Sequence, residues 1–226
     1  MKGIFVAGTD TGVGKTVVTG LLARHMSLKG HSVVTQKWAG TGRVSDIDTH
    51  IKMMGKRLCD FAEIRSAMAP YHFKFASSPH LAARLEGKRI DPERIKRSFR
   101  SLSRRFDIVI IEGIGGLLVP LRNNILVIDI VKDLKLPVIL VAANKVGAIN
   151  HALLSLEAMR ARKIRIIGTI FNDAVPEKEA IRLDNPHAVM RIGGTEMLGA
   201  LPHARGMVAL DRCFRPIGDR IAEYHG

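Results

Sequence analysis

Long apolar runs, secretory signals and paired cysteines are all absent from this 226-residue sequence. Charged residues interrupt every hydrophobic stretch before it reaches the ~18 residues that a membrane span needs. The amino terminus lacks the extended apolar region and the small-residue cleavage site of a signal peptide. The two cysteines, Cys59 and Cys213, form no CxxC motif, so the pattern indicates neither a disulfide framework nor a cysteine zinc site. We therefore expect a cytoplasmic protein.

Aromatic and acidic residues are also scarce. Aromatics make up 5% of the chain, and 21 Asp and Glu face 35 Lys and Arg, which gives a formal net charge of +14. Such an excess is compatible with a nucleic acid, a membrane surface or an anionic substrate as partner. The basic residues concentrate at positions 94–105 and 160–163, and both stretches have helical patterns. With few aromatic rings to stack on bases, a solvated helical face is the better interpretation, and nucleic acid is not an expected partner.

Short apolar runs alternate with helical patterns along the chain. The runs occupy residues 4–7, 33–35, 108–111, 138–142 and 164–171, and the helical patterns residues 15–28, 80–86, 92–102, 150–162 and 177–190. Most of the runs are continuously apolar, as in parallel strands that are covered on both faces. The alternation predicts a single α/β domain over residues 1–226, with a mostly parallel central sheet and helices on both faces. Residues 125–134 are compatible with either a strand or a short helix.

The strongest local signal is the sequence GTDTGVGKT at residues 8–16, which lies between the first expected strand and the first expected helix. Glycines in such a loop turn backbone N–H groups toward phosphate oxygens, and the helix N-terminus adds positive partial charge. In a phosphate loop Lys15 would contact the β- and γ-phosphates, and the Thr16 hydroxyl would coordinate Mg²⁺. Five residues rather than four separate Gly8 from Gly14. A glycine turn without a ligand is disfavoured, because GKT stands in the required strand–turn–helix context.

A carboxylate is needed to complete a magnesium site beside such a loop. The apolar run at 108–111 ends in Glu112, and the glycine-rich sequence GIGG follows it. Ligands of open α/β sheets bind beyond the carboxyl ends of the strands, so Glu112 is expected beside the phosphate loop. Taken alone, Glu112 could merely cap the following turn. A second acid is available from Asp46 or Asp48 in the polar segment after the second strand.

These motifs together resemble those of the dethiobiotin synthetases, the ATP-dependent enzymes of the penultimate step of biotin synthesis. Residues 8–16 resemble the family's GTDTxVGKT, including the one-residue expansion, and residues 112–116 resemble its EGAGG. Trp38 replaces the family's proline, and residues 53–68 and the tail from 204 match weakly. The remaining matches, in the family's order, are Lys37 with Thr41-Gly42, the SPH sequence at 78–80, GAINHA at 147–152, ND at 172–173 and GALP at 199–202.

The resemblance implies a phosphate-loop NTPase fold and an ATP-dependent reaction. In that reaction 7,8-diaminopelargonate and CO₂ form dethiobiotin through a carbamate and a carbamic-phosphoric anhydride. It also implies Mg²⁺ and a homodimer with a shared active site. The implied catalytic residues are Lys15 and Lys37, and the implied metal ligands are Thr16, Glu112 and Asp46, which is favoured over Asp48 by the family's Ser-Asp pattern.

The resemblance also assigns binding roles to individual residues. Thr11 and Thr41 are implied to contact the reacting end of the diamine, and Gly147, Ala148 and Asn150 to hold its distal carboxylate from the neighbouring subunit. The implied ATP-binding residues are Gly12, Val13, Gly14, Lys15, Thr16, Val17, Asp46, Glu112, Gly113, Ile114, Gly115, Asn172, Asp173, Leu201, Pro202 and His203.

Two alternative functions remain compatible with a phosphate loop. A cobyrinate-type amide synthase also phosphorylates a carboxylate, but it needs a glutamine-hydrolysing domain for which 226 residues leave little room. A chromosome-partitioning ATPase has a second lysine early in its loop, where this sequence has Thr9, Asp10 and Thr11. Adding 7,8-diaminopelargonate with bicarbonate, or DNA, to an ATPase assay would separate the three.

Overall fold

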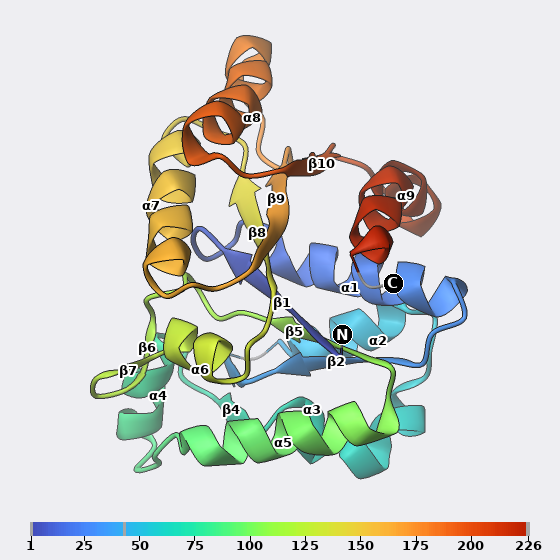
Figure 1. The fold of residues 1–226 in the computed structure, drawn as a ribbon. Coiled ribbons are helices and arrows are strands. Elements are labelled where there is room, and N and C mark those ends of the chain that lie inside the picture. The colour runs from blue at the N-terminus through green and yellow to red at the C-terminus, as the bar shows by residue number, and fades with distance from the viewer. Residues whose placement is uncertain (1, 43, 225–226) are drawn as a thin grey trace.

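The computed structural model describes residues 2–42 and 44–224 and is built around one parallel β-sheet. The six strands of this sheet have the order β10-β9-β8-β1-β5-β2, and every neighbouring pair is parallel (Figure 1). This arrangement confirms the predicted α/β fold with a parallel sheet. The strands are β1 (Gly3–Gly8), β2 (Val33–Lys37), β5 (Ile108–Glu112), β8 (Val138–Ala143), β9 (Ile166–Asn172) and β10 (Met197–Leu201).

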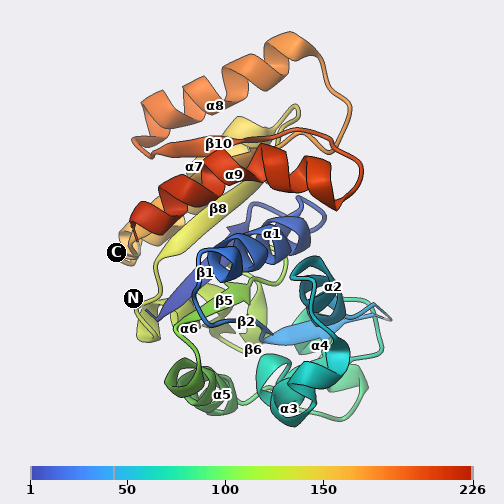
Figure 2. The ribbon, with the colours of Figure 1, turned by 90° about the vertical axis from the view of Figure 1, so that its right-hand side faces the viewer.

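Helices cover both faces of the sheet, so each strand is buried on two sides. Side chains of β1 alternate between the faces: Phe5 belongs to one apolar cluster, whereas Ile4 and Val6 belong to the other. The helices α1 (Lys15–Leu28) and α9 (Met207–Glu223) pack on each other and cover the face of Ile4 and Val6 (Figure 2). The opposite face carries α5 (Pro92–Arg105), α6 (Val127–Asp133) and α7 (Ala148–Ala161), and α8 (Glu179–Gly193) packs on α7.

Smaller elements surround the β2 and β5 side of the sheet (Figures 1 and 2). Two of them form a short parallel pair, and another two form an antiparallel hairpin. Near them, α2 packs against α1. These elements are α2 (Asp46–Met53), the 3₁₀-helix η1 (Leu58–Ile64), α3 (Arg65–Met68), α4 (Pro79–Leu85), the pair β3 (Ala39–Thr41) and β4 (Tyr71–Phe73), and the hairpin β6 (Pro120–Arg122) and β7 (Ile125–Leu126).

The structure resolves or adds several elements that the sequence pattern left open. Residues 125–134 are mainly the helix α6, preceded by the two-residue strand β7. The strand β10 was not predicted, because Gly199 interrupts its apolar run and removes the side chain that would complete the pattern. The helices α2 and α9 were also not predicted; α9 contains Pro216 and Gly218, which obscure its helical signal.

Intramolecular partners occupy part of the basic helix α5. The guanidinium of Arg94 lies 4.7 Å from the centre of the Tyr71 ring, and Arg97 lies 3.2 Å from a carboxylate oxygen of Asp91. Lys96 Nζ lies 2.6 Å from Asp133 on α6. Part of the positive charge is therefore tied to the protein's own surface. Separately, among the described residues no helix is both long and apolar enough to cross a membrane.

Candidate active site

The loop after β1 has the geometry of a phosphate loop. Gly12 and Gly14 have φ values of 74° and 98°, a region that residues with a side chain rarely adopt. A Cβ atom on Gly14 would lie 2.0 Å from Asn172 Nδ2, so no larger residue fits without displacing that side chain. No side chain caps the N-terminus of α1. The first backbone N–H groups of α1 are therefore available to an anion.

Lys15 begins α1 and folds back over the loop. Its Nζ donates a hydrogen bond to the carbonyl oxygen of Asp10 at 2.7 Å, and only 6% of the residue is exposed. Burial, reinforced by the positive charge of Lys37, lowers the pKa of Lys15 from 10.5 to about 8. The phosphate loop thus holds a partly desolvated ammonium group at the position where phosphate charge would arrive.

Two neighbouring strands place Lys37 against Glu112. Lys37 ends β2 and Glu112 ends β5, and the two residues are partners in the register of the sheet. Lys37 Nζ lies 2.6 Å from Glu112 Oε1 and also donates to the carbonyl oxygen of Gly113 at 3.2 Å. From α2, Asp46 Oδ2 lies 2.8 Å from the same nitrogen. One ammonium group therefore sits between two carboxylates at the carboxyl edge of the sheet.

Thr16 joins this group from the first turn of α1. Its Oγ1 lies 3.0 Å from Glu112 Oε1 and 3.3 Å from Asp46 Oδ1. Asp48, the other acid of this segment, lies apart from the group and pairs with Arg65. The geometry thus favours Asp46 over Asp48 as the acid at this site.

Glu112 is ionised despite its burial. Burial alone would raise the pKa of this carboxyl, which is 2% exposed. The His50 imidazole and the Lys37 ammonium together outweigh burial and lower the pKa from 4.5 to about 2. The carboxylate is consequently available at neutral pH as an oxygen ligand.

The donor set fits a magnesium ion that is shared with phosphate oxygens. Thr16, Asp46 and Glu112 supply hard oxygen atoms, the type that Mg²⁺ prefers. Within the described part of the chain, no group of three His, Cys, Asp or Glu residues could hold a metal ion alone. Mg²⁺ commonly takes one or two carboxylates together with substrate phosphates, and this arrangement supplies that number.

A cleft of about 760 Å³ opens beside these groups. Its polar wall includes Thr11 from the phosphate loop and Thr41 from the end of β3. Its apolar wall includes Ile114 and Val119, which follow Glu112 in the chain. The remaining lining residues are Gly12, Gly14, Lys15, Thr16, Val17, Lys37, Ala39, Asp46, Ala76, Ser77, Ser78, Pro79, Glu112 and Gly115.

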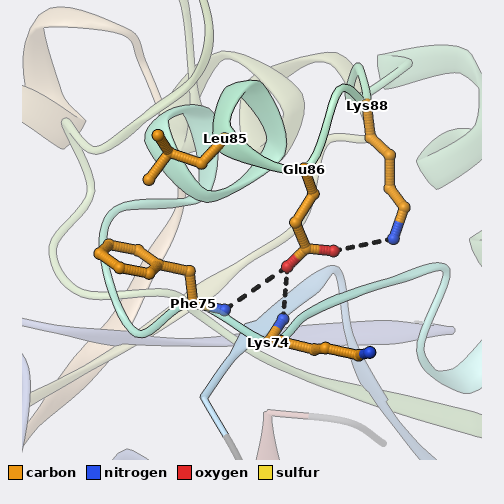
Figure 3. A pocket seen from close by; sticks show the side chains of 5 residues that line it. All are labelled: Lys74, Phe75, Leu85, Glu86 and Lys88. Atoms are coloured by element: carbon orange, nitrogen blue, oxygen red, sulfur yellow. Dashed lines mark hydrogen bonds and ion pairs between the residues drawn. The ribbon is translucent and has the colours of Figure 1, made fainter.

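One wall of the cleft, residues 76–79, follows a turn that Glu86 anchors (Figure 3). The backbone N–H groups of Lys74 and Phe75 donate to Glu86 Oε1 at 2.5 and 3.4 Å, and Lys88 Nζ lies 2.8 Å from Oε2. The pKa of Glu86 is lowered, chiefly by the hydrogen bond from Lys88. Because its oxygens are engaged, Glu86 acts as a structural anchor of this wall, and the described residues that line the hollow around it include no other acid.

The residues expected at the nucleotide base lie beside the loop rather than in this cleft. Asn172 Nδ2 donates to the Val13 carbonyl at 3.0 Å, which ties the end of β9 to the phosphate loop. Asp173 N donates to the Leu201 carbonyl at 2.9 Å, and the Asp173 carboxylate accepts a hydrogen bond from Asn144 at 2.8 Å. Pro202 and His203 follow Leu201 and are exposed.

Gly147, Ala148 and Asn150 are not among the described residues that line the cleft of their own chain. Gly147 precedes α7 with a φ of 86°, and no side chain caps that helix. Asn150 is exposed. These residues form an open helix N-terminus at the carboxyl end of β8, separate from the groups around Lys37.

Several residues at the site carried no signal in the sequence. Ala39, Ala76, Ser77 and Val119 line the cleft only because of chain geometry, since small residues of these types occur throughout the sequence. His50 is fully buried, and its Nε2 lies 2.8 Å from Glu112 Oε2. The position of His50 four residues after Asp46, on an amphipathic segment, is the only feature that could have indicated it.

The lowered pKa of Lys15 makes anion binding depend on pH. A phosphate group beside Lys15 stabilises the ammonium form and raises its pKa, so binding is tightest when Lys15 is protonated. We expect nucleotide affinity to be constant below about pH 8 and to fall above it, with proton uptake on binding above about pH 8. Titration calorimetry in two buffers of different ionisation enthalpy measures this uptake. Lys15→Arg, which stays charged throughout, should abolish it, and equal uptake by both proteins would contradict the assignment.

Comparisons with known sequences place most of the chain in one family. A family model described as an AAA domain matches residues 2–209. The ATP-dependent dethiobiotin synthetase BioD of Chlorobaculum tepidum is 48% identical over 177 residues, which are 76% of this chain and 74% of that protein. BioD 2 of Haemophilus influenzae is 38% identical and covers 83% of this chain and 99% of its own length.

Solved structures with the same fold are more distant in sequence. The cell division ATPase MinD of Pyrococcus furiosus has a TM-score of 0.64 at 14% identity and covers 99% of this chain and 100% of its own. The septum site-determining protein MinD of Pyrococcus horikoshii, complexed with Mg-ADP, has a TM-score of 0.65 at 15% identity, with coverage of 100% and 97%. At such identities the similarity shows the phosphate-loop ATPase fold alone.

Proposed function

Because this chain belongs to the dethiobiotin synthetase family, we propose that it closes the cyclic urea of dethiobiotin from 7,8-diaminopelargonate, CO₂ and ATP. The proposal treats residues 1–226 as a single domain and the cytoplasm, where ATP is supplied, as its location. The observation that carries it is the position of Lys37, whose ammonium lies between Asp46 and Glu112 and beside the phosphate loop. A cation at that point can contact both the γ-phosphoryl group that is transferred and the carbamate oxygen that receives it.

The reaction requires charge neutralisation at each of its steps. One amine of the substrate adds to CO₂ and loses a proton, which gives a carbamate. A carbamate oxygen attacks the γ-phosphorus and ADP leaves, which forms the mixed anhydride. The second amine then attacks the carbonyl carbon, phosphate leaves and the ring closes. Phosphoryl transfer needs mainly positioning and electrostatic stabilisation, which Lys15 and Lys37 would supply to the phosphoryl and carbamate oxygens.

In this proposal Thr16, Asp46 and Glu112 hold Mg²⁺ together with the nucleotide phosphates. The ion would neutralise charge on the β- and γ-phosphate oxygens. The backbone N–H groups of Gly12, Val13 and Gly14 would bind the same phosphates, and Val17 and the 113–115 segment would flank them. Asn172, Asp173 and residues 201–203 would contact the adenine, supported by the hydrogen bond that ties Asn172 to Val13. Thr11 and Thr41, which line the cleft, would bind the reacting end of the diamine.

The proposal includes a homodimer whose two chains share each active site. The open N-terminus of α7 suits a carboxylate, yet its residues do not line the cleft of their own chain. Two exposed apolar side chains lie next to this helix N-terminus in the chain: Val146 is 71% exposed and Leu154 56%. A second chain that covers these side chains would remove their apolar surface from water. In a two-fold dimer, Gly147, Ala148 and Asn150 of one chain would hold the distal carboxylate of the diamine bound to the other.

The direct test of the proposed reaction is product formation by the purified protein. We expect ATP hydrolysis to depend on both 7,8-diaminopelargonate and bicarbonate, with one dethiobiotin formed per ADP, as measured by mass spectrometry and a coupled ADP assay. Stimulation by DNA, without any requirement for the diamine, would instead support the partitioning ATPase. Hydrolysis that requires glutamine and another carboxylate would support an amide synthase.

Mixing two inactive variants tests the shared site. Asn150→Ala should lose the distal carboxylate contact, and Lys15→Ala the phosphate contact, so each homodimer is nearly inactive. A heterodimer then contains one site with both changes and one intact site. If subunits exchange freely, half of the dimers are mixed and activity should return to about a quarter of the wild-type value. Exchange demonstrated by mass spectrometry without recovered activity would place Asn150 in its own chain's structure, where it would serve only α7.

A further inference from the structure

The two oxygens of the buried Glu112 carboxylate have different surroundings. Oε1 accepts hydrogen bonds from Lys37 Nζ at 2.6 Å and from Thr16 Oγ1 at 3.0 Å. Oε2 is buried, and no described group makes a regular hydrogen bond to it. The His50 imidazole lies beside it, with Nε2 at 2.8 Å from Oε2. Oε2 therefore depends on His50 for its polar contact within the described part of the chain.

The helix α2 delivers both His50 and Asp46 to this carboxylate. The two residues are one helical turn apart and lie on the same face of the helix. Asp46 Oδ2 contacts Lys37, which contacts Glu112 Oε1, while His50 reaches Oε2 directly. His50 is fully buried, so it cannot turn away to solvent without leaving a cavity. The position of α2 thus fixes groups on both sides of the same carboxylate.

A carboxylate that is held at one oxygen retains freedom about its last torsion, which has broad energy wells. Contact at the second oxygen removes that freedom. A buried carboxylate oxygen without a polar partner also destabilises the ionised form. An apolar side chain in place of His50 could fill the space between α2 and β5, but it would leave Oε2 without a partner and Glu112 free to rotate.

We propose that His50 is a positioning residue that holds Glu112 Oε2, so that Oε1 stays directed at Thr16 and at the magnesium ion of a bound nucleotide. The inference rests on the proposed function in one respect: the site is taken to bind a nucleotide together with Mg²⁺. Replacing a residue that orients a metal ligand typically lowers metal affinity or activity by about 10- to 100-fold. His50 acts through Glu112 and does not contact substrate.

The test measures binding of a non-hydrolysable ATP analogue by titration calorimetry, with Mg²⁺ and with EDTA. The variants are His50→Leu, which is apolar, His50→Asn, which is too short to reach Oε2, and His50→Gln, which keeps an N–H donor at similar reach. We expect Leu and Asn to weaken Mg²⁺-supported binding about 10- to 100-fold and to leave metal-free binding within about twofold. The His50→Gln variant should recover most of the lost affinity for the analogue in the presence of Mg²⁺. Ile51→Val, a buried apolar change on the same helix, is the matched control.

Several outcomes would overturn the proposal. Equal losses of analogue affinity with and without Mg²⁺ would show that His50 only stabilises the fold. Unchanged Mg²⁺ dependence of binding in His50→Asn would show that His50 does not position Glu112. If His50→Leu does not fold, the Asn and Gln variants decide the question. In a Glu112→Gln background, His50→Asn should have no further effect on Mg²⁺-supported binding, whereas additive losses would contradict action through Glu112. No diamine is present in these assays, so failure to make dethiobiotin would refute the proposed reaction without affecting this result.

Discussion

Replacing Lys15 by alanine is expected to reduce kcat/KM for ATP by about a thousand-fold, the upper end of the range for loss of one preorganised hydrogen-bond donor. Lys15 Nζ lies against the loop carbonyl of Asp10 and is available to the phosphates that the loop would bind. Lys15 is the one Lys or Arg in the loop at residues 8–16. The nearby Lys37 is engaged by two carboxylates and does not replace it. Steady-state rates with ATP as the varied substrate measure the effect.

The fold should tolerate this substitution. The lowered pKa of Lys15 means that the folded state disfavours its charged form relative to water, so its removal relieves an unfavourable interaction. We expect the melting temperature to be unchanged or slightly higher and the circular dichroism spectrum to match that of the wild type. Lys56→Ala, which removes an exposed lysine outside the site, is the matched control. A Lys15→Ala protein that is folded and turns over normally would refute the nucleotide assignment.

The sequence was sufficient to predict the parts of the fold in which local pattern and packing agree. The first helix was predicted over 15–28 and is Lys15–Leu28, because a glycine turn precedes it and apolar residues continue along it. Five of the six strands of the main sheet were predicted, since most of them are continuous apolar runs. The strand β10 and the helix α9 depend on tertiary contacts with β9 and α1, and neither has an uninterrupted local signal.

For the site, the sequence identified groups that lie at strand ends or in a glycine loop. Lys15, Thr16, Lys37 and Glu112 meet at one edge of the sheet, because all its strands are parallel and end there. The spacing of Asp46 and Asp48 could not separate them, and only the direction in which α2 presents each side chain does so. His50 was missed because a lone histidine in an apolar helix face is usually a core residue.

Fold similarity alone would have misled the functional assignment. The MinD structures have TM-scores of 0.64 and 0.65 against this chain, and the net charge of +14 could be taken to support a partitioning role. The loop of this chain has Thr9, Asp10 and Thr11 early in its sequence, and its site holds two cations, Lys15 from α1 and Lys37 from β2. The similarity to the MinD structures therefore shows the fold alone, and the functional assignment rests on the dethiobiotin synthetase relatives.

Replacing Lys37 by glutamine is therefore expected to lower kcat by about 100- to 1,000-fold while changing the KM for ATP only a few-fold. A charge that stabilises oxygens chiefly in the transition state affects kcat, whereas uniform binding affects KM. Loss of the ammonium leaves Asp46 and Glu112 without their shared cation, so Mg²⁺ affinity should rise rather than fall. Rates measured at saturating Mg²⁺, with ATP and the diamine varied in turn, exclude metal loss as the cause.

The variant Lys37→Arg separates the effect of the positive charge from the effect of the position of that charge. Lys37→Arg keeps the positive charge but replaces a compact ammonium with a planar fork, in a space where Nζ lies 2.6 and 2.8 Å from two carboxylates. We expect it to bind ATP like the wild type and to recover only part of kcat, because the guanidinium cannot occupy the same point between Asp46 and Glu112. If Lys37→Gln keeps a normal kcat and only raises the KM for ATP, Lys37 contributes to ground-state nucleotide binding and the carbamate step needs another cation.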